Sequence, residues 1–284
     1  MKHAVIDIGS NSVRLLMESD GKILYKTLET TRLAEGLAKT GALSAAAMYR
    51  TALAVREFKF EALRGGASEV YAFATAAVRS AANGGDFVRL TKEIAGIGVD
   101  VISGDEEARI GLAGVLGAGD GGVLDVGGGS TELIVRKGGN VVFAKSLDIG
   151  AVRLYDLCGR DRKKLEALVR ERLAPFAGVD CDVPLYAIGG TATSLAALSM
   201  RLARYDAAKV QDYVLSKERL DEVIDEIFSL TPETLTAGSC LPLKRSEVVG
   251  GGAVIVAETL RILGVGAVTV SERDNLEGYL AGKL

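Results

Sequence analysis

The sequence is short of several residue types, and each shortage excludes a class of site. It has one histidine, His3, three cysteines without a C-x-x-C pair, and no tryptophan. Zinc sites take their ligands mainly from cysteine and histidine, so no zinc site is expected. A Ser-His-Asp hydrolase is also excluded, because the chain offers no suitable histidine as its base. Aromatic residues make up 5% of the chain, so alanine and aliphatic side chains must fill its core.

Charge, cysteine content and hydropathy indicate the partners and the compartment. The formal net charge is −3, which argues against general nucleic-acid binding. No apolar run approaches membrane-spanning length, and the N-terminus lacks the apolar segment of a secretion signal, so no membrane partner is expected. Three widely spaced cysteines indicate reduced thiols in a cytoplasmic protein: Cys158, Cys181 and Cys240. An anionic substrate must then be attracted by a local site.

The most informative stretch runs from Gly121 to Val135, GGVLDVGGGSTELIV. The chain has neither a P-loop, G-x-x-x-x-G-K-[ST], nor a dinucleotide-binding G-x-G-x-x-G after a strand. In this stretch two apolar runs flank three glycines, which predicts a β-hairpin whose tip has few side chains. The N–H groups of such a tip can point together at a phosphate. The tip residues are Gly127, Gly128, Gly129 and Ser130.

Asp125 and Glu132 lie on the two arms of this predicted hairpin. The turn brings their carboxylates back towards each other beside the tip. Mg²⁺ is usually held by one or two carboxylates together with phosphate oxygens and water, so the pair is a candidate metal site. The alternative is a plain glycine-rich turn with two solvated acids.

An internal repeat favours the functional interpretation. Ile6 to Met17, IDIGSNSVRLLM, aligns without gaps with Leu124 to Val135, LDVGGGSTELIV. A second pair of segments, VYAFAT and LYAIGG, has nearly the same offset. A period this long indicates two similar α/β domains, each opening with a strand-turn-strand. Two such hairpins facing each other across a cleft is the plan of the actin, sugar-kinase and Hsp70 superfamily, which the sequence resembles.

We therefore predict an α/β protein of two actin-like (ribonuclease H-like) domains, with mixed sheets flanked by helices and an active site in the interdomain cleft. The GDGG stretch at 119–122 is the best boundary, giving domains 1–120 and 121–284. Strands are expected at 4–8, 13–18, 22–29, 69–75, 99–103, 140–148, 185–188 and 267–271. Helices are expected at 44–63, 161–176, 217–230 and 245–263, with 33–43 as a loop. Three glycines at 250–252, inside the last of these helices, indicate close approach of another element.

Three further segments supply candidate site residues. In ATAAVRSAAN, Arg79 follows a strand end, where ligands bind in open α/β sheets; the alternative is a surface salt bridge. In GDEEAR, Asp105 is a candidate N-cap, and the acids after it suit the helix dipole. Successive helical side chains point in different directions, so at most one of Glu106 and Glu107 can face the cleft. A third small-residue turn opens a helix and suits an anion: Gly189, Gly190 and Thr191.

Taken in order, five segments resemble the exopolyphosphatase / guanosine pentaphosphate phosphohydrolase family: VIDIGSNSVRLL, ATAAVR-x-A-x-N, ISGDEEAR, LDVGGGSTEL and AIGGTATSLAA. The resemblance spans roughly Val5 to Gly278. It implies an actin-like enzyme that hydrolyses the terminal phosphate of inorganic polyphosphate or of the guanosine alarmone, using Mg²⁺ or, in its place, Mn²⁺. It implies Glu107 as the catalytic base and Arg79 as a phosphate ligand. It also implies that Asp125 and Glu132 are the metal-associated acids.

General chemistry fits these roles. Phosphoryl transfer depends on positioning and charge stabilisation, which Mg²⁺, Arg79 and the glycine-rich tip would supply. Glu107 would deprotonate a water lined up opposite the leaving phosphate. Because Glu107 and Asp125 fall in different predicted domains, the cleft is expected to close to bring them together. The first hairpin would hold phosphates through Ser10, Asn11 and Ser12.

Three alternatives to a polyphosphate hydrolase are open. One is hydrolysis of guanosine pentaphosphate at its 5′ phosphates. Another is an actin-like nucleotide or phosphate sensor without turnover, which would have no need of a base at Glu107. The third is an ATP-dependent kinase of the superfamily, although nothing in the sequence marks an acceptor site. The sequence is also compatible with a homodimer.

The chain departs from the family's pattern near residue 276. Many relatives have a basic residue just before the Glu-Gly of the last segment, where RDNLEG has Leu276, and Arg273 is out of register. Longer relatives also carry a C-terminal helical domain that this sequence lacks. A long polyphosphate is gripped by repeated cationic contacts, whereas exposed, screened charges contribute little. We therefore expect the protein to hold a few terminal phosphates and to use short chains well.

Overall fold

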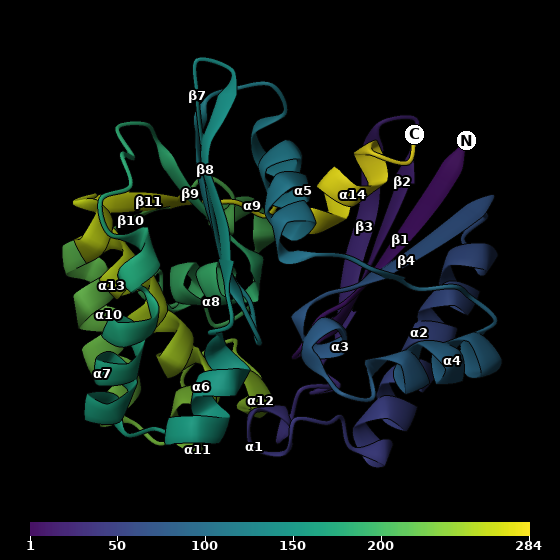
Figure 1. The fold of residues 1–284 in the computed structure, drawn as a ribbon, viewed down its shortest axis with the longest axis horizontal. Coiled ribbons are helices and arrows are strands. Elements are labelled where there is room, and N and C mark those ends of the chain that lie inside the picture. Colours follow the sequence, from purple (N-terminus) through teal and green to yellow (C-terminus); the bar gives the residue numbers. More distant parts are fainter.

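The computed structural model describes residues 1–284 and contains two mixed β-sheets flanked by helices (Figure 1). The first sheet has the strand order β3-β2-β1-β4-β5. Within it, β2 is antiparallel to β1 and to β3, whereas β4 and β5 run parallel to β1. Its strands are β1 (Lys2–Ile8), β2 (Val13–Ser19), β3 (Lys22–Glu29), β4 (Glu69–Ala74) and β5 (Asp100–Val101).

The second sheet has the strand order β10-β11-β9-β6-β7-β8. Five of its strands, β8-β7-β6-β9-β11, repeat the order and directions of the first sheet. The repeat read in the sequence is therefore a repeat of topology, and the predicted fold class of two actin-like halves is confirmed. The strands are β6 (Gly121–Val126), β7 (Thr131–Lys137), β8 (Asn140–Leu147), β9 (Leu185–Ile188), β10 (Val214–Ser216) and β11 (Ala267–Val270).

Local sequence sets the ends of the helices in the first half. The predicted helix at 44–63 is α2 (Ala45–Arg64), and it begins where the Ser44 hydroxyl accepts a hydrogen bond from the amide of Ala47 at 3.2 Å. The prediction of a loop over 33–43 misses a short helix, α1 (Leu37–Thr40), which lies between two left-handed glycines, Gly36 and Gly41. The other helices of this half are α3 (Ala76–Ser80), α4 (Gly84–Ala95) and α5 (Gly104–Leu116).

Two predicted helices of the second half are shorter than expected. The segment 161–176 forms α7 (Arg162–Arg172) and then the 3-10 turn Ala174–Phe176, because Pro175 has no N–H to continue the ladder. The segment 245–263 forms the end of α12 (Leu243–Ser246) and then α13 (Val249–Leu263), because the Val248 amide bonds to a carbonyl only three residues back. The others are α6 (Ala151–Cys158), α8 (Gly189–Ser199), α9 (Ala207–Val210), α10 (Lys217–Ser229), α11 (Pro232–Ala237) and α14 (Asn275–Ala281).

The glycines of α13 lie where other helices approach it closely, as their position in a helical pattern predicts. A Cβ atom on Gly252 would lie 2.5 Å from Cγ2 of Thr191, at the start of α8. A Cβ atom on Gly251 would lie 3.2 Å from Cβ of Leu154 in α6. The glycines therefore let α13 support the turn that opens α8.

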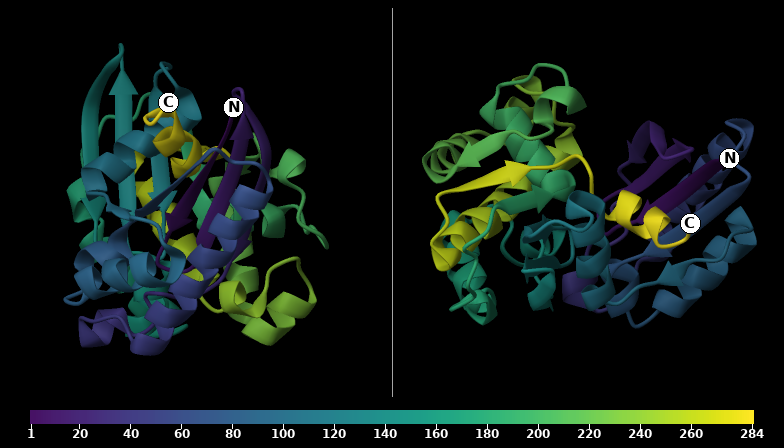
Figure 2. Two further views of the ribbon diagram at one scale, coloured as in Figure 1. Left: turned by 90° about the vertical axis from the view of Figure 1, so that its right-hand side faces the viewer. Right: turned by 90° about the horizontal axis from the view of Figure 1, so that it is seen from above.

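Two helices, α5 and α14, lie between the two sheets (Figure 1 and the right-hand view of Figure 2). Helix α5 packs on β6, β7 and β8, while α14 packs on α5 and on β1 and β2. A small apolar cluster ties α14 to the first sheet: Val5, Leu16, Phe73, Ile102, Leu276, Tyr279 and Leu280. The division into domains 1–120 and 121–284 stays a proposal. No helix has both the length and the apolarity needed to cross a bilayer.

Candidate active site

Three carboxylates meet between the sheets: Glu107 of α5, Asp125 of β6 and Glu132 of β7. One oxygen atom from each lies within 4.8 Å of one from each of the others. The residues are nearly buried, with exposed fractions of 6%, 8% and 1% respectively. We call this group the acid centre. The expectation that a cleft must close to bring Glu107 and Asp125 together is wrong, because they are already together.

The β6–β7 hairpin places two of the three acids. Asp125 lies directly opposite Glu132 in the antiparallel pair, so both side chains are on one face of the sheet. On the next strand, the hydroxyl of Ser146 donates a hydrogen bond to Oε1 of Glu132 at 2.6 Å. The other oxygen, Oε2 of Glu132, is buried without a hydrogen-bond partner. The predicted approach of the two carboxylates across the hairpin is confirmed.

Helix α5 supplies the third acid. Its N-cap is Ser103, whose hydroxyl accepts a hydrogen bond from the amide of Glu106 at 3.2 Å, so the prediction of Asp105 as N-cap is wrong. Both are good capping residues, and the helix begins at the earlier one. Glu106 is exposed, whereas Glu107 is buried in the acid centre. The expectation that only one of the two adjacent acids can point inward is confirmed.

Arg79 lies beside the acid centre on α3, directly after β4. Its Nη1 atom donates to Oε2 of Glu107 at 3.0 Å and to the carbonyl of Ile102 at 2.9 Å. Arg79 thus forms an ion pair, but its partner belongs to the acid centre and is not a surface acid. The bond to the carbonyl of Ile102 helps to hold the guanidinium beside Glu107.

Electrostatics make three negative charges in the acid centre costly. Burial, reinforced by Asp125, raises the pKa of Glu107 to about 8, although the Arg79 guanidinium opposes the rise. Burial likewise raises the pKa of Asp125 to about 7, against the opposing charge of Arg14. Burial raises the pKa of Glu132 as well, and Glu107 and Asp125 add to the effect. Without a cation, the centre therefore holds protons near neutral pH.

The residues present fit a divalent cation. The three acids supply oxygen atoms close together, and Oε2 of Glu132 is buried without a partner. An unpartnered buried carboxylate oxygen is costly, and a bound cation would satisfy it. Carboxylates are the ligands that Mg²⁺ and Mn²⁺ prefer in proteins.

The raised proton affinities predict an unusual pH dependence of stability for the metal-free protein. Glu107 and Asp125 titrate near pH 8 and 7 when folded, but near their ordinary values of 4.5 and 3.8 when unfolded. Between those limits the folded state binds more protons, so the free energy of unfolding falls as pH rises. The free energy of unfolding falls by about 1.4 kcal/mol per pH unit for each proton that the folded state holds and the unfolded state does not. The Tm in EDTA should therefore fall from pH 5 to pH 8.5.

The control for this prediction is the same scan with Glu107→Gln, which removes one of the titrating groups. Its Tm should fall less steeply over the same range. Addition of Mn²⁺ should raise the wild-type Tm more at pH 8.5 than at pH 5, because a cation competes with protons for the same oxygens. A wild-type Tm that is flat or rises between pH 5 and 8.5 in EDTA would contradict the prediction.

The two glycine- and serine-rich tips are in contact. A Cβ atom on Gly128 would lie 2.9 Å from Cβ of Ser10, and one on Gly129 would lie 2.6 Å from its hydroxyl oxygen. Glycine is therefore required at both positions for this approach. The two predicted phosphate-binding tips, residues 10–12 and 127–130, therefore meet through Ser10 and Asn11 on one side and Gly128 and Gly129 on the other.

The third predicted turn, Gly189, Gly190 and Thr191, forms the start of α8 and also reaches the centre. Gly189 has a left-handed φ of +78°, and a Cβ atom there would lie 2.7 Å from Oδ1 of Asp125. A Cβ atom on Gly190 would lie 2.5 Å from Nη2 of Arg245. The turn therefore lies between an acid of the centre and an arginine.

Arg245 is a candidate that sequence reasoning missed. It forms no ion pair, and burial, with a contribution from Arg14, lowers its pKa to about 10. A cation without an acidic partner beside a glycine turn at a helix N-terminus suits a phosphate. The residue lies in α12, at the start of the single helix predicted over 245–263, and no motif marked it.

An ion-pair network next to the acid centre was also missed. Arg14 binds Oδ2 of Asp7 through Nη2 at 2.5 Å and also pairs with Asp274. Asp7 lies opposite Arg14 in the β1–β2 register, as Asp125 lies opposite Glu132 in β6–β7. Aligning the two halves of the repeat could therefore have predicted the pairing of Asp7 with Arg14, because these residues occupy the positions of Asp125 and Glu132. Asp7, the counterpart of Asp125, is held by an arginine and not by the acid centre.

The departure at Leu276 has a structural explanation. Leu276 is 1% exposed and packs in the apolar cluster with Val5, so this position faces the core and not the acid centre. Arg273 is exposed. The residue of this segment that reaches the centre is Asn275, whose Nδ2 atom donates to Oδ2 of Asp125 at 2.7 Å.

Comparison with known proteins agrees with this geometry. Residues 14–284 match the model of the Ppx/GppA phosphatase family. The chain is 33% identical to exopolyphosphatase 2 of Mycobacterium tuberculosis, over 97% of this chain and 96% of that protein. A crystal structure of an exopolyphosphatase-like protein superposes with a TM-score of 0.91 at 27% identity, covering 100% of this chain and 98% of that one. A structure of the PPX-GPPA enzyme of Aquifex aeolicus gives 0.80 at 31% identity, covering 99% of both chains.

Proposed function

Because this chain belongs to the Ppx/GppA phosphatase family, and so is a phosphoric anhydride hydrolase, we propose that it releases the terminal phosphate of inorganic polyphosphate. The observation that carries this proposal is the acid centre, Glu107 with Asp125 and Glu132, beside three turns that suit phosphate. The alternative substrate is guanosine pentaphosphate, which ends in a phosphoric anhydride as polyphosphate does. A sensor without turnover fits less well, because it has no need of the buried Glu107.

Asp125 and Glu132 are the residues proposed to hold Mg²⁺, or Mn²⁺ in its place. Asp125 is held by Asn275, and Glu132 by Ser146, so each acid has one oxygen fixed by a neutral donor. When bound, the cation would neutralise charge on the phosphate oxygens and lower the cost of burying the acids.

Glu107 is the proposed general base. Its carboxylate accepts a proton from water while the water oxygen bonds to the terminal phosphorus and the bond from that phosphorus to the bridging oxygen breaks. The shortened polyphosphate leaves with the bridging oxygen. Arg79 donates to one oxygen of Glu107 and favours its charged form, which is the form that accepts a proton. A base is most effective when its pKa lies near the working pH.

The phosphates themselves would be bound by backbone N–H groups and two arginines. From the first hairpin these groups are Ser10, Asn11 and Ser12, and from the second the tip from Gly127 to Ser130; Ser10 and Asn11 contact that tip at Gly128 and Gly129. The turn from Gly189 to Thr191 opens α8, where the helix dipole favours an anion. Arg79 and Arg245 are the two cations proposed to contact phosphate oxygens.

These proposed phosphate-binding groups predict how the rate depends on the length of the polyphosphate chain. Arg79 lies at the acid centre and Arg245 beside the turn at Gly190, whereas Leu276 is buried and offers no further cation on that side. Phosphates beyond the first few would then lie in solvent, where screened contacts contribute little. Short oligophosphates should have a kcat/KM equal to or above that of chains of hundreds of phosphates. Steady-state phosphate release from size-fractionated polyphosphate measures this.

Guanosine pentaphosphate belongs in the same assay at matched concentrations, and a higher kcat/KM for it than for any polyphosphate would favour the alternative substrate. The Glu107→Gln protein, prepared in the same way, controls for contaminating phosphatases. A kcat/KM that climbs steeply with chain length, or processive release without short intermediates, would show a long binding track and overturn the short-chain proposal.

A further inference from the structure

We infer that Asn275 is a positioning residue of the acid centre: its amide holds the Asp125 carboxylate in place and so sets the affinity of the centre for a divalent cation. This inference rests on the metal site proposed above. Asn275, which is 150 positions from Asp125 in the sequence, then belongs to the same site.

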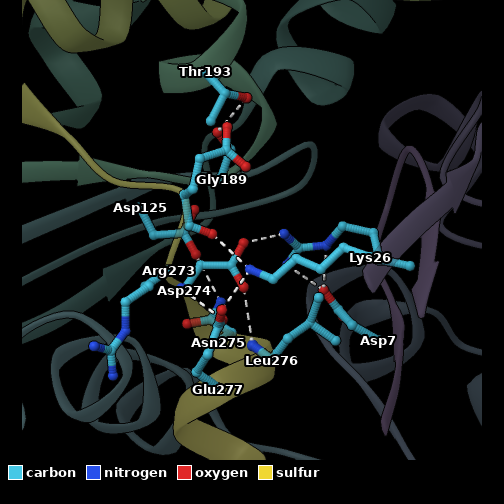
Figure 3. A network of polar contacts seen from close by, with 12 residues as sticks. Asp7, Lys26, Asp125, Gly189, Thr193, Arg273, Asp274, Asn275, Leu276 and Glu277 are labelled. Carbon is cyan, nitrogen blue, oxygen red and sulfur yellow. Dashed lines mark hydrogen bonds and ion pairs between the residues drawn. The ribbon is translucent and has the colours of Figure 1, made fainter. Parts of the chain in front are cut away.

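The contact itself is short and buried. Nδ2 of Asn275 lies 2.7 Å from Oδ2 of Asp125, and the two residues are 3% and 8% exposed (Figure 3). Turning the amide over would put its oxygen against the carboxylate, which would be repulsive, so the nitrogen must face Asp125. A neutral donor orients the carboxylate without adding a charge to a centre that already has three acids.

The chain around Asn275 leaves its amide little freedom. Asp274 caps α14 by accepting from the amide of Leu276 at 2.9 Å, and Glu277 completes the capping box by accepting from the amide of Asp274 at 3.0 Å. Arg14 holds the Asp274 carboxylate from the first sheet. Leu276 is buried on the other side. Asn275 is thus fixed between an ion pair and an apolar cluster.

Helix α14 is also seated directly on α5, the helix that carries Glu107. A Cβ atom on Gly111 would lie 2.7 Å from Oδ1 of Asn275, and one on Gly114 or Gly278 would overlap the backbone of the facing helix. Gly111 is four residues after Glu107, on the same helical face. Helix α14 therefore packs against the helix that carries Glu107 and also orients the carboxylate of Asp125, which it contacts through Asn275.

Partners that orient metal ligands commonly change metal affinity by 10–100-fold when they are removed. The test uses Asn275→Leu, which keeps the branched shape at Cγ and removes the donor, and Asn275→Ala, in case the larger leucine side chain prevents folding. The matched control is Tyr279→Phe on the same helix, which removes the hydroxyl bond to Asp100 and keeps the stacked ring on Phe73. Mn²⁺ binding is measured directly by electron paramagnetic resonance on the full chain.

Both Asn275 variants should bind Mn²⁺ about 10–100-fold more weakly than wild type. The line shape of the bound Mn²⁺ should also change, because the ligand set is less ordered. Tyr279→Phe should bind within about twofold of wild type with an unchanged line shape. Folded Asn275 variants with wild-type affinity and line shape would overturn the inference, and so would an equal loss in Tyr279→Phe.

Asp125→Asn distinguishes failure of the inference from failure of the proposed metal site. If wild type binds Mn²⁺ and Asp125→Asn does not, the site stands and only the role of Asn275 is in question. If wild type binds no Mn²⁺, or Asp125→Asn binds it equally well, the proposed site and the inference both fall.

Discussion

Replacing Glu107 by glutamine is expected to lower kcat by about 10²–10⁴-fold while leaving substrate binding nearly unchanged. Glutamine keeps the shape of glutamate and can still accept the hydrogen bond from Arg79, but it cannot take a proton from water. The loss should therefore appear in kcat and not in the dissociation constant of the substrate. Single-turnover phosphate release, with a separate binding measurement, resolves the two.

Glu106→Gln is the matched control, because this neighbouring acid lies on the same helix and is exposed. It should retain kcat within about twofold, as surface substitutions usually do. Equal losses in both variants, or none in either, would reject Glu107 as the base. Since Glu107 is also close enough to bind a cation, Mn²⁺ affinity is measured alongside. A base that is not a ligand predicts a much smaller loss of affinity in Glu107→Gln than in Asp125→Asn.

Removing the metal should abolish activity. EDTA should stop phosphate release, and Mg²⁺ or Mn²⁺ should restore it, because the acid centre by itself supplies no positive charge and the proposed cation would neutralise charge on the phosphate oxygens. Asp125→Asn should raise the metal concentration needed for half-maximal activity by at least about 100-fold, because loss of a ligand should cost more than loss of its partner. Metal titration of the phosphate-release rate measures both effects.

Asp120→Asn is the control for the metal titration. Asp120 precedes β6, five residues before Asp125, and its carboxylate accepts hydrogen bonds from the amides of Gly138 and Gly139, away from the centre. This variant should need the same metal concentration as wild type. Full wild-type activity in EDTA would rule out the proposed metal site, and an unchanged metal requirement in Asp125→Asn would remove Asp125 from it.

Local sequence predicts much of this site. The glycines between Asp125 and Glu132 make a hairpin, and the period of a strand then puts the two acids on one face. The period of a helix separates Glu106 from Glu107 in the same way. Both inferences span only a few residues, over which backbone geometry fixes where side chains point. The repeat extends this reasoning, because two copies of one topology must place their hairpins in equivalent positions.

Other features could not be read from local sequence. Ser103 and Asp105 are both good N-caps, and choosing between them depends on where the strand before α5 ends. The distance from Glu107 to Asp125 depends on the packing of α5 against the second sheet, which was expected to need closure and does not. Arg245, which lies in α12, was interpreted as part of one continuous helix, because a helical pattern continues through the break between α12 and α13.

The sequence by itself determined the two-sheet fold, the hairpin acids and the glycine-rich turns, because each depends on neighbours within one turn or strand pair or on an alignment of the chain with itself. Only the tertiary structure decided that Arg14 holds Asp7 and Asp274, that Asn275 rather than residue 276 faces Asp125, and that Arg245 has no acidic partner. These contacts join residues up to 260 positions apart. Their partners are chosen by how α14 and α13 pack, and packing depends on the shape of the whole core, which no short stretch of sequence contains.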